Sequence, residues 1–258
     1  MPPVHDAAQT GYSSQAQTYT QGRPTYPEAL SSWLRQKLLI DQRTRVLDLG
    51  AGTGKFTALL KPLTDRLIAV EPIDAMRREF SKSLPGIEVL AGTAQAIPSP
   101  TASVDVVLCA QAFHWFADAQ ALAEIHRVLT PGGRLGLVWN VRDESVDWVA
   151  AITRIITPYE GNAPRFHKGQ WRDPFDGSGF SAPELTCFEH SHVGSPETVI
   201  MNRILSVSFI ASLAPADKAE VTRQLHELIQ THPALRGQES IAFPYQTQAY
   251  LSHRLGGA

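Results

Sequence analysis

A glycine-rich turn directly after a short apolar segment is the feature that most constrains this chain. Arg45–Leu49 is expected to form a buried strand, and the next residues run Gly50-Ala51-Gly52-Thr53-Gly54 before a helix expected from about Lys55. Glycines let the backbone turn sharply and approach a ligand closely. The following helix would direct free backbone amides at that ligand. The pattern therefore predicts an α/β protein with a ligand-binding turn after its first strand.

Two acidic residues, one before the turn in the sequence and one after it, help to define the ligand. Glu71 ends the second expected strand, where a carboxylate can accept hydrogen bonds from ribose hydroxyls. A dinucleotide-binding turn has the spacing G-x-G-x-x-G, whereas this one has G-x-G-x-G with Asp48 just before it. That carboxylate disfavours a pyrophosphate but suits a ligand with an ammonium and a sulfonium group, which indicates S-adenosyl-L-methionine. A purely structural turn is disfavoured because turn, strand, helix and Glu71 agree.

Short apolar segments alternate with amphipathic ones through the first half of the chain. Strands are expected at residues 45–49, 67–71, 87–91, 104–110 and 134–140, and helices from 55, over 74–84 and over 119–129. A Pro-Gly-Gly turn at 131–133 is expected before the last of these strands. This alternation is typical of a mainly parallel sheet with right-handed crossovers.

The flanking regions are less regular. A helix is expected after Pro27, and beyond residue 145 we expect helices at 146–157, 197–209 and 215–230, a loop at 159–179 and strands at 184–193 and 240–250. We interpret residues 1–258 as one domain. It comprises an N-terminal arm and helix (1–40) that could act as a lid, a cofactor-binding core (41–142) and substrate-side helices with the last strands (143–258).

Composition restricts the partners. The 23 Lys and Arg nearly balance the 25 Asp and Glu, and no basic stripe is present, so we expect no nucleic-acid partner. No window approaches the roughly 18 apolar residues of a membrane span, and residues 1–26 lack the apolar core of a signal peptide. The two cysteines give no disulfide framework, since Cys109 lies in an expected buried strand. We therefore expect a cytoplasmic protein with a small-molecule partner; the oligomeric state is left open.

Several motifs occur in the order found in one enzyme family. They lie at residues 46–57, at 69–72, at 92–98 in the adenine-binding position, at 104–116 and at 124–135. Over residues 19–142 the chain resembles the class I S-adenosylmethionine-dependent methyltransferases, within the broad methyltransferase-domain group that includes trans-aconitate methyltransferase. The resemblance implies a Rossmann-like, seven-stranded, mostly parallel sheet with helices on both faces, an antiparallel last strand and a helical insertion near the C-terminus.

The resemblance also implies cofactor contacts. Asp48, Gly50, Gly52 and Gly54 would line the methionine end, and Glu71 would hold the ribose. Many relatives have an Asp after the third strand, but this chain has Thr93-Ala94 there, so Thr93, the backbone of Ala94, or Gln95 is expected to replace it. Tyr19 could close over the methyl donor and Arg23 could pair with its carboxylate, unless the arm is simply solvated. The remaining expected contacts are Ala51, Thr53, Pro72, Met76 and Gln111.

Candidate reaction residues follow the fourth and fifth strands. His114 could act as a general base, as a hydrogen-bonding group that orients the acceptor, or as a structural residue. Phe113 and Trp115 are candidates for the wall of a dry pocket, with core packing as the alternative. Asn140 and Arg142 are candidates for substrate binding, and Arg142 could bind an acidic acceptor or lie on the surface. His190 and His192 have no third ligand in view, so no metal is expected.

The sequence thus predicts an enzyme that transfers a methyl group from S-adenosyl-L-methionine to a small-molecule acceptor, mainly by proximity and in-line orientation. A nicotinamide-dependent oxidoreductase and a non-catalytic S-adenosylmethionine-binding protein are the alternatives.

Overall fold

Seven strands form one sheet in the order β3-β2-β1-β4-β5-β7-β6 in the computed structural model, which describes residues 23–256. The strands are β1 (Arg45–Leu49), β2 (Arg66–Val70), β3 (Glu88–Leu90), β4 (Val104–Ala110), β5 (Leu129–Arg142), β6 (Glu184–Gly194) and β7 (Ile241–His253). β1 to β5 pair in parallel, and β7 runs antiparallel to both β5 and β6. This confirms the predicted Rossmann-like sheet with an antiparallel last strand.

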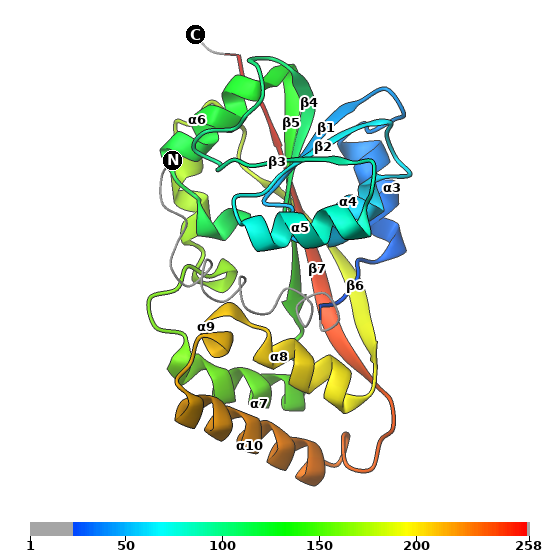
Figure 1. Ribbon diagram of the computed structural model, residues 1–258, viewed down its shortest axis with the longest axis vertical. Coiled ribbons are helices and arrows are strands. Elements are labelled where there is room, and N and C mark those ends of the chain that lie inside the picture. Colours follow the sequence, from blue (N-terminus) through cyan, green and yellow to red (C-terminus); the bar gives the residue numbers. More distant parts are fainter. Residues whose placement is uncertain (1–22, 257–258) are drawn as a thin grey trace.

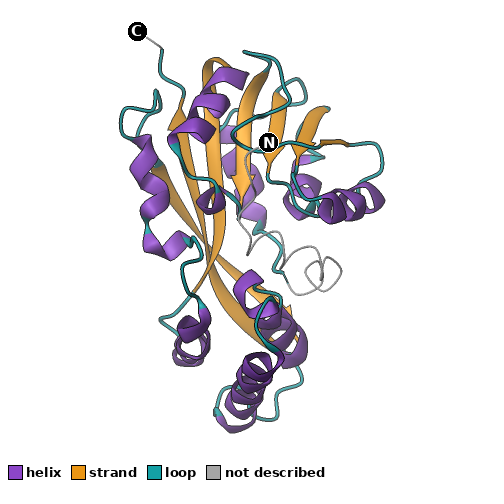
Figure 2. Cartoon of the chain, turned by 60° about the vertical axis from the view of Figure 1, so that its left-hand side comes forward, coloured by secondary structure: helices purple, strands orange, loops and turns teal. Residues whose placement is uncertain are grey.

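Helices cover both faces of the sheet (Figure 2). Successive side chains of a strand point to opposite faces, so the apolar run 106–110 of β4 serves two cores. Val106 and Leu108 pack in one cluster with α3 (Glu28–Lys37) and α4 (Lys55–Leu60). Val107 and Cys109 pack in another with α6 (Ala119–Val128). α5 (Asp74–Ser83) covers the outer part of the sheet through Phe80, which packs with Ala69 of β2 in a smaller cluster.

A helical lobe lies at the end of the molecule opposite to α4, α5 and α6 (Figure 1). It consists of α7 (Asp147–Ile156), the π-helix η5 (Glu197–Asn202), α8 (Arg203–Leu205), α9 (Ser208–Ala211) and α10 (Pro215–Thr231). These helices share a separate apolar core with the first half of β7, through Phe243 and Tyr245. The lobe therefore packs on an extension of the same sheet.

Three local expectations were wrong. The helix expected over 197–209 is divided, because Val207 has an extended backbone between α8 and α9. The loop expected over 159–179 contains the 3-10 helices η3 (Phe166–Lys168) and η4 (Gln170–Phe175), which bury Trp171 and Phe175 against the sheet; η2 (Thr157–Tyr159) precedes them. The turn expected at 131–133 is an irregular stretch within β5, where the register with β4 shifts and Gly132 has a φ of +77°.

No helix within residues 23–256 is both long enough and apolar enough to cross a membrane.

Candidate functional site

The turn after β1 has the backbone that its glycines were expected to supply. Gly50, Gly52 and Gly54 all have positive φ, at +74°, +58° and +86°. A Cβ on Gly50 would lie 2.7 Å from Cβ of Ala112, and one on Gly54 would lie 2.7 Å from Cδ1 of Leu84, whereas one on Gly52 would meet nothing within 4 Å. Gly50 and Gly54 therefore permit close packing, and Gly52 leaves open space above the turn.

Glu71 connects this turn to the second strand. Its side chain is 5% exposed, and it accepts hydrogen bonds from the backbone N–H groups of Gly52 and Ile73, each at 2.9 Å. Burial raises the pKa of the carboxyl above its ordinary value, while the two backbone hydrogen bonds act in the opposite direction. The carboxyl group is thus fixed to the backbone of the turn at Gly52, although Glu71 is not among the residues that line the cavities described below.

Asp48 lies behind the turn and is fully buried. The hydroxyl of Thr57 donates to its Oδ2 at 2.6 Å, and its Oδ1 is buried without a hydrogen-bond partner. Burial raises the pKa of this carboxyl to about 7, and the nearby charge of Glu71 acts in the same direction. Asp48 is not among the residues that line a cavity here, so it would act on a ligand through its charge rather than by lining the pocket.

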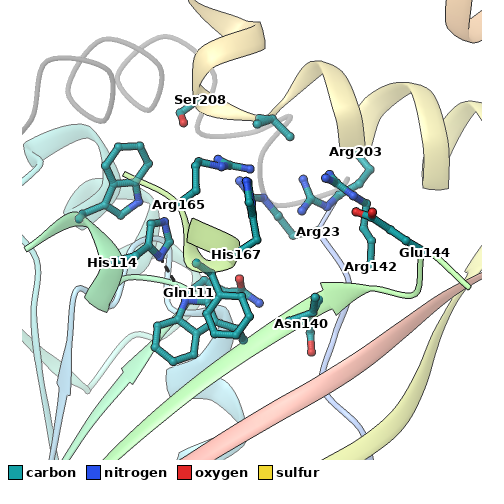
Figure 3. A pocket seen from close by; sticks show the side chains of 15 residues that line it. Arg23, Gln111, His114, Asn140, Arg142, Glu144, Arg165, His167, Arg203 and Ser208 are labelled. Atoms are coloured by element: carbon teal, nitrogen blue, oxygen red, sulfur yellow. Dashed lines mark hydrogen bonds between the residues drawn. The ribbon is translucent and has the colours of Figure 1, made fainter. Parts of the chain in front are cut away.

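Two adjacent cavities open above the turn. The inner cavity, over the glycines, is also lined by the turn residues Ala51 and Thr53 and by Tyr26 and Lys55. The outer cavity encloses about 730 Å³, including its open mouth, between the ends of the strands and the lobe (Figure 3). Both cavities are lined by Arg23, Gln111, Asn140 and Arg203, and we call this shared region the junction.

Gln111 and Asn140 reach the junction from the ends of β4 and β5. Gln111 has a φ of +60°, a conformation that non-glycine residues adopt at a cost of about 1 kcal/mol or more. Asn140 accepts a hydrogen bond from the hydroxyl of Thr247 at 2.6 Å and donates to the backbone carbonyl of Thr25 at 2.8 Å. The second contact holds the N-terminal segment against the cavity, which brings Arg23 into its wall.

His114 lines the outer cavity, where the indole Nε1–H of Trp139 donates to its Nδ1 at 3.1 Å. Because an indole nitrogen can only donate, Nδ1 must be unprotonated and the proton of the neutral ring must lie on Nε2. Burial lowers the pKa of His114 to about 3, and the charges of Arg165 and Arg23 act in the same direction. The imidazole is therefore neutral at ordinary pH, with an N–H to donate.

The aromatic candidates have different surroundings. Trp115 lines the outer cavity, as Trp139 does. Phe113 is fully buried and contacts Phe116 and Phe175, with ring centroids 5.6 and 5.7 Å away. Phe113 therefore lies in the core rather than in the cavity wall for which it was a candidate.

Arginines dominate the outer cavity. Arg142, a sequence candidate, lines it from the end of β5, and its Nε is buried without a hydrogen-bond partner. Arg165 and Arg203 were not predicted. Arg203 could have been found, because it is the one charged residue between Glu197 and Asp217. Arg165 gave no such signal, because it lies in a stretch of irregular sequence.

The candidates for the adenine end lie outside the two cavities. Thr93 is 6% exposed, and its Oγ1 is buried without a hydrogen-bond partner, while the adjacent Ala94 is 4% exposed. The amide of Gln95 donates to Oδ2 of Asp118 at 2.8 Å, so it is already engaged. Met76 is buried in α5, and the carbonyl of Pro72 accepts a hydrogen bond from Arg77. Tyr19 lies outside the described residues, as does most of the arm.

Over residues 23–256, no group of three or more His, Cys, Asp or Glu side chains is placed to hold a metal ion.

Comparison with known proteins identifies the family. A family model described as a methyltransferase domain matches residues 47–137. An uncharacterized methyltransferase-like protein of Schizosaccharomyces pombe is 39% identical over 239 residues, with 92% of each chain covered. An uncharacterized methyltransferase of Mycobacterium tuberculosis is 37% identical over 241 residues, again with 92% of each covered. The chain belongs to the class I S-adenosylmethionine-dependent methyltransferases.

Solved structures agree on the fold. A protein of Anaeromyxobacter dehalogenans, proposed to be a type II methyltransferase, has a TM-score of 0.67 at 23% identity, with 90% of this chain and 96% of that chain covered. The [4+2]-cyclase SpnF has a TM-score of 0.52 at 17% identity, with 92% and 85% covered. Since a cyclase shares the architecture, the fold by itself does not define the reaction.

Proposed function

We propose that the chain binds S-adenosyl-L-methionine with its methionine end in the inner cavity and transfers the methyl group to a small molecule held in the outer cavity. One observation carries this proposal: Gly52, whose backbone N–H donates to the Glu71 carboxyl, lines the inner cavity with open space at its Cβ position, and the junction connects that cavity to the outer one. Donor and acceptor would meet at the junction.

The described residues fit the cofactor. The inner cavity is lined by the cations Arg23, Lys55 and Arg203, which suit its carboxylate. The buried and unpartnered Oδ1 of Asp48 lies behind the turn and suits its positive charges. The unpartnered hydroxyl of Thr93, after β3, is a candidate partner for the adenine. S-adenosyl-L-methionine supplies an electrophilic methyl group on its sulfonium.

Positioning would supply most of the rate acceleration. The junction is lined by two arginines and two amides, and no carboxylate or histidine is among its four residues. His114 lies farther out, and its low pKa and its Nε2–H suit it to donate a hydrogen bond to the acceptor rather than to remove a proton. The residues of the chain would thus hold the acceptor in line with the methyl group and exclude water.

Two measurements test the proposal. Calorimetry should show that S-adenosylhomocysteine binds and that nicotinamide dinucleotides bind much more weakly, because the turn has the spacing G-x-G-x-G rather than the G-x-G-x-x-G of dinucleotide sites. Incubation of the protein with labelled cofactor and a metabolite extract should release S-adenosylhomocysteine and label a small molecule. A preference for the dinucleotide would overturn the cofactor assignment. Binding of the cofactor with no turnover on any extract would favour a non-catalytic binding protein.

A further inference from the structure

β6 lies at one edge of the sheet, beside β7 (Figure 1). It pairs with β7 in an unbroken antiparallel register, from Glu184 opposite Leu251 to Gly194 opposite Ile241. Within residues 23–256, no backbone hydrogen bond joins β6 to any other segment. One whole side of its 11 residues therefore presents backbone N–H and C=O groups that have no partner strand in the described chain.

The two edges of the sheet differ in how they are protected against further pairing. Natural sheets commonly protect an edge by making its strand very short, or with proline, lysine or a bulge. β3, at the opposite edge, has three residues. β6 has 11 residues, with no proline, no lysine and no shift in its register with β7. β6 is thus the edge to which a further strand can be added.

Two exposed apolar side chains lie on this edge strand. Leu185 and Val193 are 50% and 66% exposed, and they are two of the four large hydrophobic side chains that are exposed among the described residues. Single exposed hydrophobic residues need no explanation, but two on one edge strand indicate a contact surface. They are eight residues apart, so both side chains lie on the same face of the sheet, with Glu189 midway between them.

The spacing of these side chains fits pairing with a second copy of the strand. Two identical strands that pair about a two-fold axis place one residue opposite itself. If that residue is Glu189, all 11 residues of each strand are paired, and Leu185 of one copy lies opposite Val193 of the other. A shift of the axis to any neighbouring residue separates these two side chains and leaves the strand ends unpaired. The strand is therefore self-complementary in this one register.

We propose that two copies of the chain form a dimer in which their β6 strands pair antiparallel, with the two-fold axis at Glu189. The sheets of the two copies then form one continuous sheet, and main-chain hydrogen bonds supply much of the affinity. This surface is separate from the candidate functional site, because no residue of β6 lines the inner or the outer cavity. The dimer is therefore independent of the reaction proposed above.

Glu189 limits the stability of this dimer. Like charges directly opposite each other destabilise a pair of strands, whereas an apolar pair such as Leu185 with Val193 stabilises it. Glu189→Gln removes the repulsion between the two carboxylates and keeps a polar side chain of the same length. This variant should bind its own copy about twofold to fivefold more tightly than the wild type does.

Sedimentation of the full chain over a range of concentrations, up to about 1 mM, measures the association. The wild type should pass from monomer to dimer, and Val193→Lys should raise the dissociation constant about tenfold, because it places a charge in both apolar pairs. Leu39→Lys is the matched control, since it changes another exposed large hydrophobic residue away from β6 and should not alter the constant. A wild type that stays monomeric, or an equal effect of both variants, would overturn the proposal.

A disulfide tests the register. With the axis at Glu189, Cys187 of one copy lies opposite Ser191 of the other, at a separation that a disulfide can span. Under mild oxidation Ser191→Cys should form a covalent dimer on a non-reducing gel. The wild type should not, because its two Cys187 residues are offset by about 13 Å along the strands and Cys109 is buried. Ser83→Cys, at an exposed serine of α5, is the control and should also stay monomeric on the gel. Absence of the cross-link in Ser191→Cys would overturn the proposed register.

Exchange of charge at the axis gives the last test. Glu189→Lys alone replaces one repulsion with another, but a mixed dimer of this variant with the wild type places Lys opposite Glu. Native mass spectrometry of an equimolar mixture should therefore show the mixed dimer above its statistical share. A statistical distribution would show that residue 189 does not lie opposite itself, and would overturn the proposal.

Discussion

Trp139 and His114 form a pair in which the indole donates to Nδ1 of the imidazole at 3.1 Å. Trp139 is itself 1% exposed and packs against Trp171, with ring centroids 4.8 Å apart, so its N–H has little freedom to turn away. The pair fixes the tautomer of His114, and it leaves the Nε2–H as the group that the ring can offer to an acceptor.

Replacing His114 tests this role. His114→Ala should lower kcat/KM for methyl transfer by roughly threefold to tenfold, the effect of losing one hydrogen bond, and should leave S-adenosylhomocysteine affinity nearly unchanged. His114→Asn should retain much of the activity, because its amide can still donate. Turnover, cofactor affinity and melting temperature are measured for both. Full activity and normal stability in His114→Ala would exclude a functional role for this residue.

The raised pKa of Asp48 predicts a pH-dependent stability. The pKa of this carboxyl rises from its ordinary 3.8 to about 7 on folding, so the folded chain keeps a proton that the unfolded chain has lost. The protonated carboxyl therefore contributes to the free energy of unfolding. This contribution is fully present below about pH 4 and is lost as the pH rises through about 7. In Asp48→Asn the side-chain amide cannot ionise, but its oxygen can still accept the hydrogen bond from the hydroxyl of Thr57. In urea unfolding at about pH 8, the variant should be at least as stable as the wild type, and the difference should disappear below about pH 4. A less stable variant at the higher pH would contradict the prediction.

Gly52→Val should abolish cofactor binding and leave the fold largely intact. The new side chain would occupy the open space above the turn and would resist a φ of +58°. Gly237→Val is a matched control that lies away from the turn, because Gly237 also has a positive φ, of +73°, and a Cβ at that position would likewise meet nothing within 4 Å. Both variants should lose a similar amount of stability, and calorimetry should show that only Gly52→Val loses S-adenosylhomocysteine binding. Equal affinities would place the cofactor elsewhere.

Glu71→Ala should weaken S-adenosylhomocysteine binding by about 1.5–3 kcal/mol, the range for a hydrogen bond to a charged group. The affinity should fall for two reasons. The carboxyl would hold the ribose, and it also accepts a hydrogen bond from the backbone N–H of Gly52, which keeps the turn in place. Glu71→Gln keeps one acceptor oxygen and should lose less. Calorimetry on the two variants gives the comparison, and unchanged affinity in Glu71→Ala would move the ribose contact to another residue.

The part of the fold that follows from local signals was predictable. The glycines of the turn and the apolar run of β4 specify the parallel half of the sheet with little help from distant residues. The helix boundaries in the lobe were not predictable in the same way, because no Gly or Pro marks the break at Val207 between α8 and α9.

The inner cavity was better predicted than the outer one for a related reason. Gly50 and Gly52 follow a strand that the sequence identifies, whereas Arg165 lies in an irregular segment next to aromatic residues that pack against the sheet. Sequence spacing also could not show that Phe113 points into the core while Trp115 faces the cavity. The contact between His114 and Trp139 depends on how the chain turns after β4 to bring His114 to a residue of the neighbouring strand β5, and so requires the structure.

β7 contributes side chains to three clusters. Phe243 and Tyr245 belong to the core of the lobe, Leu251 packs on the face covered by α3, and Tyr250 packs on the face covered by α6. It is also the strand on which β6 pairs, and in chain order it follows every other strand. We therefore expect the sheet and the lobe to fold together, because β6 and the core of the lobe both need β7 in place beside β5. The described part of the chain should then unfold in a single cooperative transition.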